Sequence, residues 1–194
     1  MTVDYRTSRR PLLRHLSRTL AVLFDRDDTL VLDVPRYSGD PTRVVPLPGA
    51  RNAVSRLRAA GFPVGVVSNQ SGIGRGMLTV EQVDAVNRRV EQLVGAMDTW
   101  RYCPHTALDS CTCRKPGPQL VLQASADLGV PAHRVVVIGD IGSDMQAAQA
   151  AGAVGILVPS PRTLKVEIRQ APLVAQNLGE AVDMVLTACP RASR

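Results

Sequence analysis

Short apolar runs that end abruptly at a polar or structure-breaking residue recur along the chain. Four such runs contain four to six residues each, and they cover 20–24, 62–67, 135–138 and 154–158. Runs this short and this uniformly apolar are typical of strands buried on both faces of a parallel sheet. A fifth, weaker candidate at 99–102 leads directly into Cys103.

Helical patterns fill the intervals between these runs. They cover 50–60, a segment from the Thr79-x-x-Gln82 capping box to about 97, 119–128, a segment from Ser143 to 151, and 178–186. Strands that alternate with helices predict an α/β fold, a doubly wound parallel sheet with right-handed crossovers. We expect one domain over 19–190, preceded by a basic extension over 1–18.

Charge and composition narrow the possible classes of protein. The net charge of +6 suggests a polyanion partner, but the excess lies at the two ends. Residues 1–20 contain five arginines and one aspartate, the last four residues contain two arginines, and the remainder is balanced. No apolar run approaches the roughly 18 residues of a membrane span, and no signal peptide is evident. We therefore expect a cytoplasmic monomer that binds neither membranes nor nucleic acid, with solvated basic ends.

Carboxylates gather where two of the predicted strands end. Asp25, Asp27 and Asp28 follow the first run, and Asp140 and Asp144 follow the third. The alternative, a solvated acidic turn, explains the first group but not its recurrence at a second strand end. Strand ends of a parallel sheet meet at one edge, and clustered carboxylates need a cation between them. Oxygen ligands alone favour Mg²⁺.

A cysteine–histidine cluster occupies 103–113. Its pattern is Cys-x-His, five residues, then Cys-x-Cys, and the possible ligands are Cys103, His105, Cys111 and Cys113. Three thiolates and one imidazole form a closed tetrahedral Zn²⁺ set, so we expect a structural zinc. A redox Cys-x-Cys pair or buried structural cysteines are the alternatives. The first does not explain Cys103 and His105, and the second does not suit so polar a loop.

Taken in order, these motifs with Ser68 and Lys115 resemble the haloacid-dehalogenase-like (HAD) phosphatase superfamily. The resemblance implies a Rossmann-like core, with Asp25 as nucleophile and Asp27 as general acid and base. It also implies that Ser68 and Lys115 bind the phosphoryl oxygens. Mg²⁺ would bind the side chains of Asp25 and Asp140 and the backbone carbonyl of Asp27, with Asp144 supporting this site from behind. Lys115 is one of only two lysines in the chain, which favours a specific role for its compact ammonium.

The zinc motif is similar to the branch that contains the heptose 1,7-bisphosphate 7-phosphatases and the histidinol-phosphate phosphatases. Neither interval between the motifs is long enough for a large cap domain. The branch implies substrate contacts from two loops and from the residue after the zinc motif: Asp33, Val34, Pro35, Arg36, Ser68, Asn69, Gln70, Ser71 and Arg114. Asp28 departs from the branch, which has glycine there. We expect a small phosphorylated sugar, namely D-glycero-D-manno-heptose 1,7-bisphosphate, as substrate. Histidinol phosphate is one alternative, and a non-catalytic, zinc-stabilised binding module is another.

Overall fold

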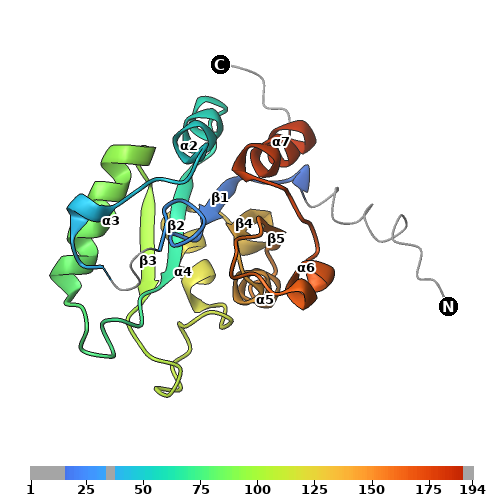
Figure 1. Cartoon of the computed structure of the whole chain (residues 1–194). Helices are drawn as coiled ribbons and strands as arrows, with labels where there is room; N and C mark the ends of the chain where they lie inside the picture. The colour runs from blue at the N-terminus through green and yellow to red at the C-terminus, as the bar shows by residue number, and fades with distance from the viewer. Residues whose placement is uncertain (1–15, 34–37, 190–194) are drawn as a thin grey trace.

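Five parallel strands form the centre of the molecule. The computed structural model describes residues 16–33 and 38–189. The strands are β1 (Ala21–Phe24), β2 (Val64–Asn69), β3 (Thr99–Cys103), β4 (Val135–Gly139) and β5 (Val154–Leu157), in the order β3-β2-β1-β4-β5. Strand order therefore reverses at β1, which pairs with both β2 and β4 (Figure 1). Ligands of open parallel sheets bind at the carboxyl edge beside such a reversal.

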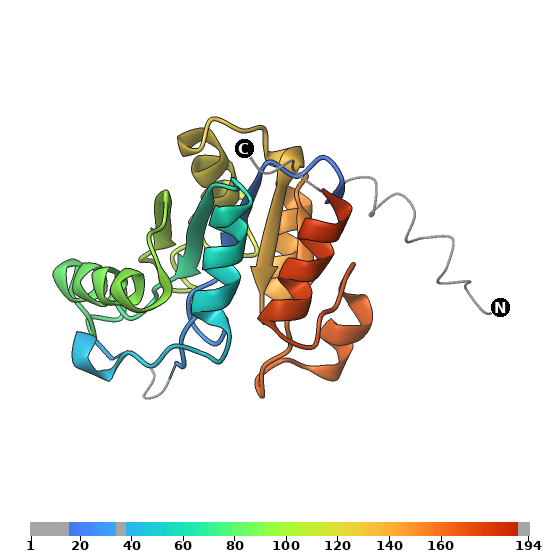
Figure 2. The ribbon, with the colours of Figure 1, turned by 90° about the horizontal axis from the view of Figure 1, so that it is seen from above.

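Helices cover both faces of this sheet (Figure 2). One hydrophobic cluster joins the sheet to α2 (Ala50–Ala59), α3 (Val80–Val94) and α7 (Leu178–Ala188). A second cluster joins the opposite face to α4 (Gln119–Asp127) and α5 (Gly142–Ala150). The shorter elements are α6 (Lys165–Gln170) and the 3-10 turns η1 (Pro41–Arg43) and η2 (Ala132–Arg134). The predicted doubly wound α/β architecture is confirmed.

Alternation of side chains along the strands explains the two clusters. In β1, Val22 and Phe24 face the α2–α7 side, while Ala21 and Leu23 face the α4–α5 side. Because successive side chains of a strand point to opposite faces, a strand buried on both sides must be apolar at every position. All four residues of β1 are fully buried.

Element boundaries differ from the predicted ones at a few places. The helix that begins after the Thr79–Gln82 capping box ends at Val94, because Gly95 adopts a positive φ of 115°. The prediction that Ser143 caps the next helix is wrong. The N-cap is Ile141, whose N–H donates to the carboxylate of Asp144, so Asp144 satisfies the helix terminus and Ser143 lies inside the first turn. Helix α6 was not predicted.

The ends of the chain bear on two expectations. Within the described residues, no helix combines the length and the apolar character that a membrane crossing requires. Most of the expected basic extension, residues 1–15, lies outside the described residues, as do 190–194. Leu16 is fully buried and packs in the cluster that includes α7.

Candidate active site

The carboxyl edge of the sheet opens into a pocket of about 690 Å³. Its lining includes every predicted catalytic residue, the predicted Mg²⁺ ligands and most of the predicted substrate contacts, namely Asp25, Asp27, Asp33, Ser68, Asn69, Gln70, Ser71, Arg114, Lys115 and Asp140. Residues separated by more than one hundred positions in the sequence thus share one cavity. The predicted contacts Val34, Pro35 and Arg36 lie outside the described residues.

Lys115 joins two buried carboxylates at the base of this pocket. Its Nζ donates to Asp25 Oδ1 at 2.6 Å, to Asp144 Oδ1 at 2.5 Å and to the carbonyl of Val67 at 2.9 Å. Burial by itself lowers the pKa of Lys115, but attraction to Asp144 and Asp25 outweighs burial, and the net pKa is raised. Lys115 is therefore a fixed positive charge with all three of its N–H donors occupied.

Three buried carboxyl groups nevertheless surround the single positive charge of Lys115. Single oxygens of Asp25, Asp140 and Asp144 lie within 4.8 Å of one another, and all three residues are buried. Burial raises the pKa of Asp25 to about 8; Lys115 opposes that rise and Asp144 adds to it. Burial and Asp144 also raise the pKa of Asp140 to about 7. A cluster of buried oxygen donors with excess negative charge has the chemistry of a Mg²⁺ site, so the donor set fits that ion.

The loop after β5 holds Asp140 in position through two hydrogen bonds. Ser160 Oγ donates to Asp140 Oδ2 at 2.7 Å, and the hydroxyl of Thr163 donates to the backbone carbonyl of Asp140. One carboxylate oxygen of Asp140 is thus occupied by Ser160. The loop lies beside the cluster because β5 neighbours β4 in the sheet.

Asn69 lines the pocket and also bonds to the backbone of Lys115. Its amide nitrogen donates to the carbonyl of Lys115 at 3.1 Å, and its amide oxygen accepts from the Lys115 N–H at 3.0 Å. Both polar atoms of the side chain are therefore bonded to the backbone of Lys115. Asn69, the last residue of β2, therefore holds the backbone of Lys115 in position.

Asp28 acquires a clear structural role. Its φ of 56° is a left-handed conformation, which glycine adopts without strain and which aspartate tolerates better than most residues. Its carboxylate accepts from the N–H of Asp33 and pairs with Arg162 Nε at 3.2 Å. Arg162 also pairs with Asp33 at 2.6 Å. The extra carboxylate thus anchors an arginine at the pocket wall.

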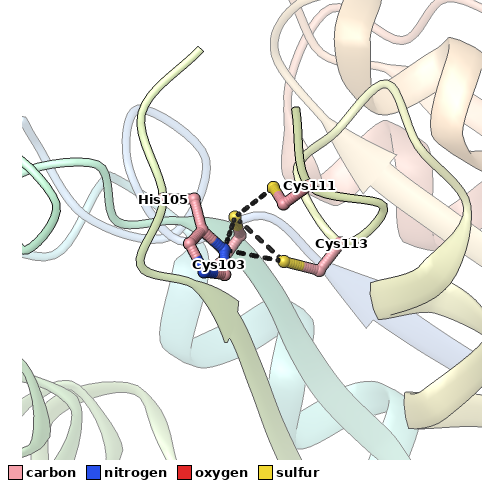
Figure 3. Close-up of side chains that lie close together, drawn as sticks. All are labelled: Cys103, His105, Cys111 and Cys113. Carbon is pink, nitrogen blue, oxygen red and sulfur yellow. Dashed lines mark hydrogen bonds between the residues drawn. The ribbon is translucent and has the colours of Figure 1, made fainter. Parts of the chain in front are cut away.

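The four residues of the predicted zinc motif converge at the carboxyl end of β3 (Figure 3). His105 Nδ1 lies 3.2 Å from Cys113 Sγ and 3.5 Å from Cys103 Sγ. Cys103 Sγ lies 3.2 Å from Cys113 Sγ and 3.6 Å from Cys111 Sγ. Ligands of a tetrahedral zinc ion are about 3.5–3.8 Å apart, so the set is close to the required geometry.

Comparison with known proteins agrees with this geometry. Residues 112–181 match the model of the HAD-hydrolase-like family. The D-glycero-beta-D-manno-heptose-1,7-bisphosphate 7-phosphatase of Pseudomonas aeruginosa is 33% identical over 178 residues, which cover 88% of this chain and 99% of that protein. The chain belongs to the HAD-like hydrolases. The predicted family and enzyme class, a phosphoric monoester hydrolase, are thereby confirmed.

Two further similarities place it within that family. The corresponding phosphatase of Rhodopseudomonas palustris is 38% identical over 149 residues, covering 71% of this chain and 82% of that protein. The D,D-heptose 1,7-bisphosphate phosphatase of B. bronchiseptica, solved with magnesium and phosphate, superposes with a TM-score of 0.75 and 28% identity. That match covers 86% of this chain and 98% of the solved one.

Several residues at this HAD-type site were not predicted from the sequence. Arg26 is buried, and its place between Asp25 and Asp27 in the sequence could have marked it as a site residue. Arg43, Arg75 and Arg162 line the pocket. Arg75 lies in the segment 68–76, which resembles the same phosphatase branch, whereas no local pattern distinguishes Arg43 and Arg162 among the chain's many arginines.

Proposed function

We propose that this chain hydrolyses the 7-phosphate of D-glycero-D-manno-heptose 1,7-bisphosphate. One observation supports the reaction above all. Asp25 follows β1 and lines the pocket, and its Oδ1 accepts a hydrogen bond from Lys115. The second oxygen is then the one that attacks phosphorus. The choice of sugar rests on the names of the relatives together with the cations of the pocket.

The proposed reaction has two steps. Asp25 attacks the phosphorus, the bond from phosphorus to the ester oxygen breaks, and Asp27 gives its proton to the departing sugar oxygen. Asp27 then removes a proton from a water molecule, which attacks the phosphorus of the aspartyl-phosphate. Inorganic phosphate leaves and the carboxylate of Asp25 is restored. Ser68 and Lys115 contribute a hydroxyl donor and a positive charge to the phosphoryl oxygens.

The cofactor role falls to the carboxylate cluster. We infer that Asp25, Asp140 and the backbone carbonyl of Asp27 bind Mg²⁺, with Asp144 acting through Lys115. When bound, Mg²⁺ neutralises charge on the phosphoryl oxygens.

Arginines at the pocket wall suit a substrate with a second phosphate. Arg43, Arg75 and Arg114 line the cavity, whereas the charge of Arg162 is already balanced by Asp28 and Asp33. A guanidinium binds phosphate through two parallel hydrogen bonds, which favours phosphate over uncharged groups. Histidinol phosphate carries a cationic amine in place of a second phosphate, so these arginines disfavour it.

We expect heptose 1,7-bisphosphate to be hydrolysed with a kcat/KM at least about 10²-fold above that of histidinol phosphate. A guanidinium forms two charged hydrogen bonds to phosphate, each of which contributes roughly 1.5–3 kcal/mol, and 1.4 kcal/mol corresponds to a factor of ten. Phosphate release should be measured with Mg²⁺ on both esters and on heptose 7-phosphate. Faster hydrolysis of histidinol phosphate would contradict the proposed substrate.

We also propose that the cysteine–histidine cluster binds a structural zinc ion. Burial raises the pKa of the Cys103 thiol to about 12, so a cation is needed to bring the three sulfurs together as thiolates. All four positions are filled by protein, which leaves none for a substrate. The ion would then shape the loop that carries Arg114 and Lys115.

Purified protein should contain about one equivalent of zinc, and Cys111→Ser should lose most of it together with thermal stability. Cys189→Ser is the matched control, because Cys189 donates to the carbonyl of Thr19 and lies outside the cluster. Metal analysis and thermal unfolding measure both effects. Wild-type protein with less than about half an equivalent, and a Cys111→Ser variant of unchanged stability, would argue against zinc.

A reducing compartment such as the cytoplasm would keep these thiols available for the metal.

A further inference from the structure

Arg26 is a buried cation that the proposed reaction does not itself use. Only 6% of the residue is exposed, yet its guanidinium is bonded on every side. Nε and Nη2 donate to Asp27 Oδ1 and Oδ2 at 2.9 and 3.1 Å. Nη2 also donates to Gln70 Oε1, and Nη1 donates to Asn87 Oδ1, both at 2.8 Å. A buried arginine is costly unless it is paired in this way.

These contacts determine the orientation of the Asp27 carboxyl group. Two parallel bonds from one guanidinium fix the plane of the group as well as its position. Gln70 Nε2 adds a third bond, to Asp27 Oδ2, at 2.7 Å. Oδ2 of Asp27 accepts two bonds, from Arg26 and Gln70, whereas Oδ1 accepts one, so Oδ1 is the oxygen with a free position for the proton that goes to the leaving group. The network therefore sets the direction in which that proton is delivered.

The same network orients Ser68. Gln70 Nε2 also donates to Ser68 Oγ at 2.9 Å. Because the serine oxygen accepts this bond, its own O–H remains available as a donor towards a phosphoryl oxygen. One cluster of side chains thus arranges the proposed acid and a phosphate donor together.

Asn87 anchors this network from outside the pocket. It lies on α3, is 7% exposed, and is not among the residues that line the cavity. Its side-chain oxygen accepts a hydrogen bond from Arg26 Nη1, which ties the position of the guanidinium to α3. The bond to Arg26 therefore gives Asn87 a route by which it influences the reaction without touching the substrate.

We propose that Asn87 and Arg26 are positioning residues that aim Asp27 at the leaving oxygen of the substrate. The inference rests on the proposed role of Asp27. The proposed role predicts different effects on two kinds of phosphate ester. A sugar alcohol leaves only if it is protonated, whereas p-nitrophenolate leaves readily as an anion and needs little help from an acid.

The experiment compares kcat/KM for the sugar bisphosphate and for p-nitrophenyl phosphate in Asn87→Ala. kcat/KM includes the steps up to departure of the leaving group, so it reports on the acid. We expect a loss of about 10- to 10²-fold for the sugar ester and a change below about threefold for p-nitrophenyl phosphate. If Asn87→Ala fails to fold, Arg26→Lys carries the same test, since an ammonium cannot form the paired bonds to Asp27.

Tyr102→Phe is the matched control. The Tyr102 hydroxyl donates to Asp84 Oδ1 at 3.1 Å and so joins α3 to β3 without reaching Asp27. This variant should leave the ratio of the two substrates unchanged. If wild-type protein hydrolyses neither ester, the proposed function fails. If it hydrolyses both and Asn87→Ala lowers them equally or not at all, the positioning role is overturned while the proposed function survives.

Discussion

Asp25→Asn is expected to lower phosphate release by a factor on the order of 10⁴ or more, the scale of losing a nucleophile that acts as a unit with its partners. An amide oxygen of asparagine is a poor nucleophile and cannot form the aspartyl-phosphate. Initial rates on the heptose bisphosphate with Mg²⁺, followed as inorganic phosphate, measure the loss.

The same substitution should leave the fold intact. Asp25 is one of three buried carboxylates that lie within 4.8 Å of one another, and burial already opposes its charge. Removing that charge relieves repulsion while Lys115 keeps its bond to Asp144. Stability should therefore be within about 1 kcal/mol of wild type, as is common where an active site stores unfavourable contacts.

Asp183→Asn is the control for Asp25→Asn. Asp183 forms an exposed pair with Arg56, and neither residue is part of the pocket lining. It should show full activity. An Asp25→Asn variant that retains wild-type turnover would exclude Asp25 as the nucleophile.

Lys115→Met is expected to lower the free energy of unfolding of metal-free protein by about 3–5 kcal/mol, the cost of leaving buried charges without a partner. Two carboxylates, Asp25 and Asp144, lose their shared cation, and the side chains of Lys115 and Asp144 are 3% and 0% exposed. Urea unfolding measures the change. Turnover should fall as well, because Lys115 is the proposed charge on the phosphoryl group.

Two companion variants isolate the cause of that destabilisation. Lys165→Met removes the other lysine of the chain, an exposed residue at the start of α6, and should be nearly neutral. Adding Asp144→Asn to Lys115→Met removes one uncompensated charge and should recover part of the lost stability. Equal unfolding midpoints for Lys115→Met and Lys165→Met would contradict the proposed role of the buried pair.

Predictions from the sequence were strongest where the evidence is local. Four of the five strands follow from apolar runs, whereas β3, which contains Arg101 and is only partly buried, gave a weaker signal. The zinc motif is also local, since four possible ligands lie within eleven residues. Helix ends were less certain, because Val94 ends its helix through the backbone conformation of Gly95, and Ile141 is capped by Asp144.

The partners of the site residues could not be predicted in the same way. The resemblance implies substrate contact for Asn69, but the sequence did not predict the bonds of its amide to the backbone of Lys115, 46 positions away. Arg162 reaches Asp33 across 129 positions, from a loop with no motif of its own. Asn87 contacts Arg26 across 61 positions, and the amphipathic pattern of its helix predicts that Asn87 is buried but not which residue it bonds.

By itself, the sequence determined the alternation of strands and helices, the aspartates at the strand ends and the ligand types of both candidate metal sites. Those features depend on residue chemistry and on periods of a few residues. Tertiary structure alone decided which charges face one another: Lys115 with Asp25 and Asp144, Arg26 with Asp27, and Arg162 with Asp28. The pairings of Lys115 and Arg162 form because the order of strands in the sheet brings distant loops to one edge, where burial makes each unpaired charge costly. Arg26 and Asp27 are adjacent in the sequence, and the fold decides only that their side chains turn towards each other.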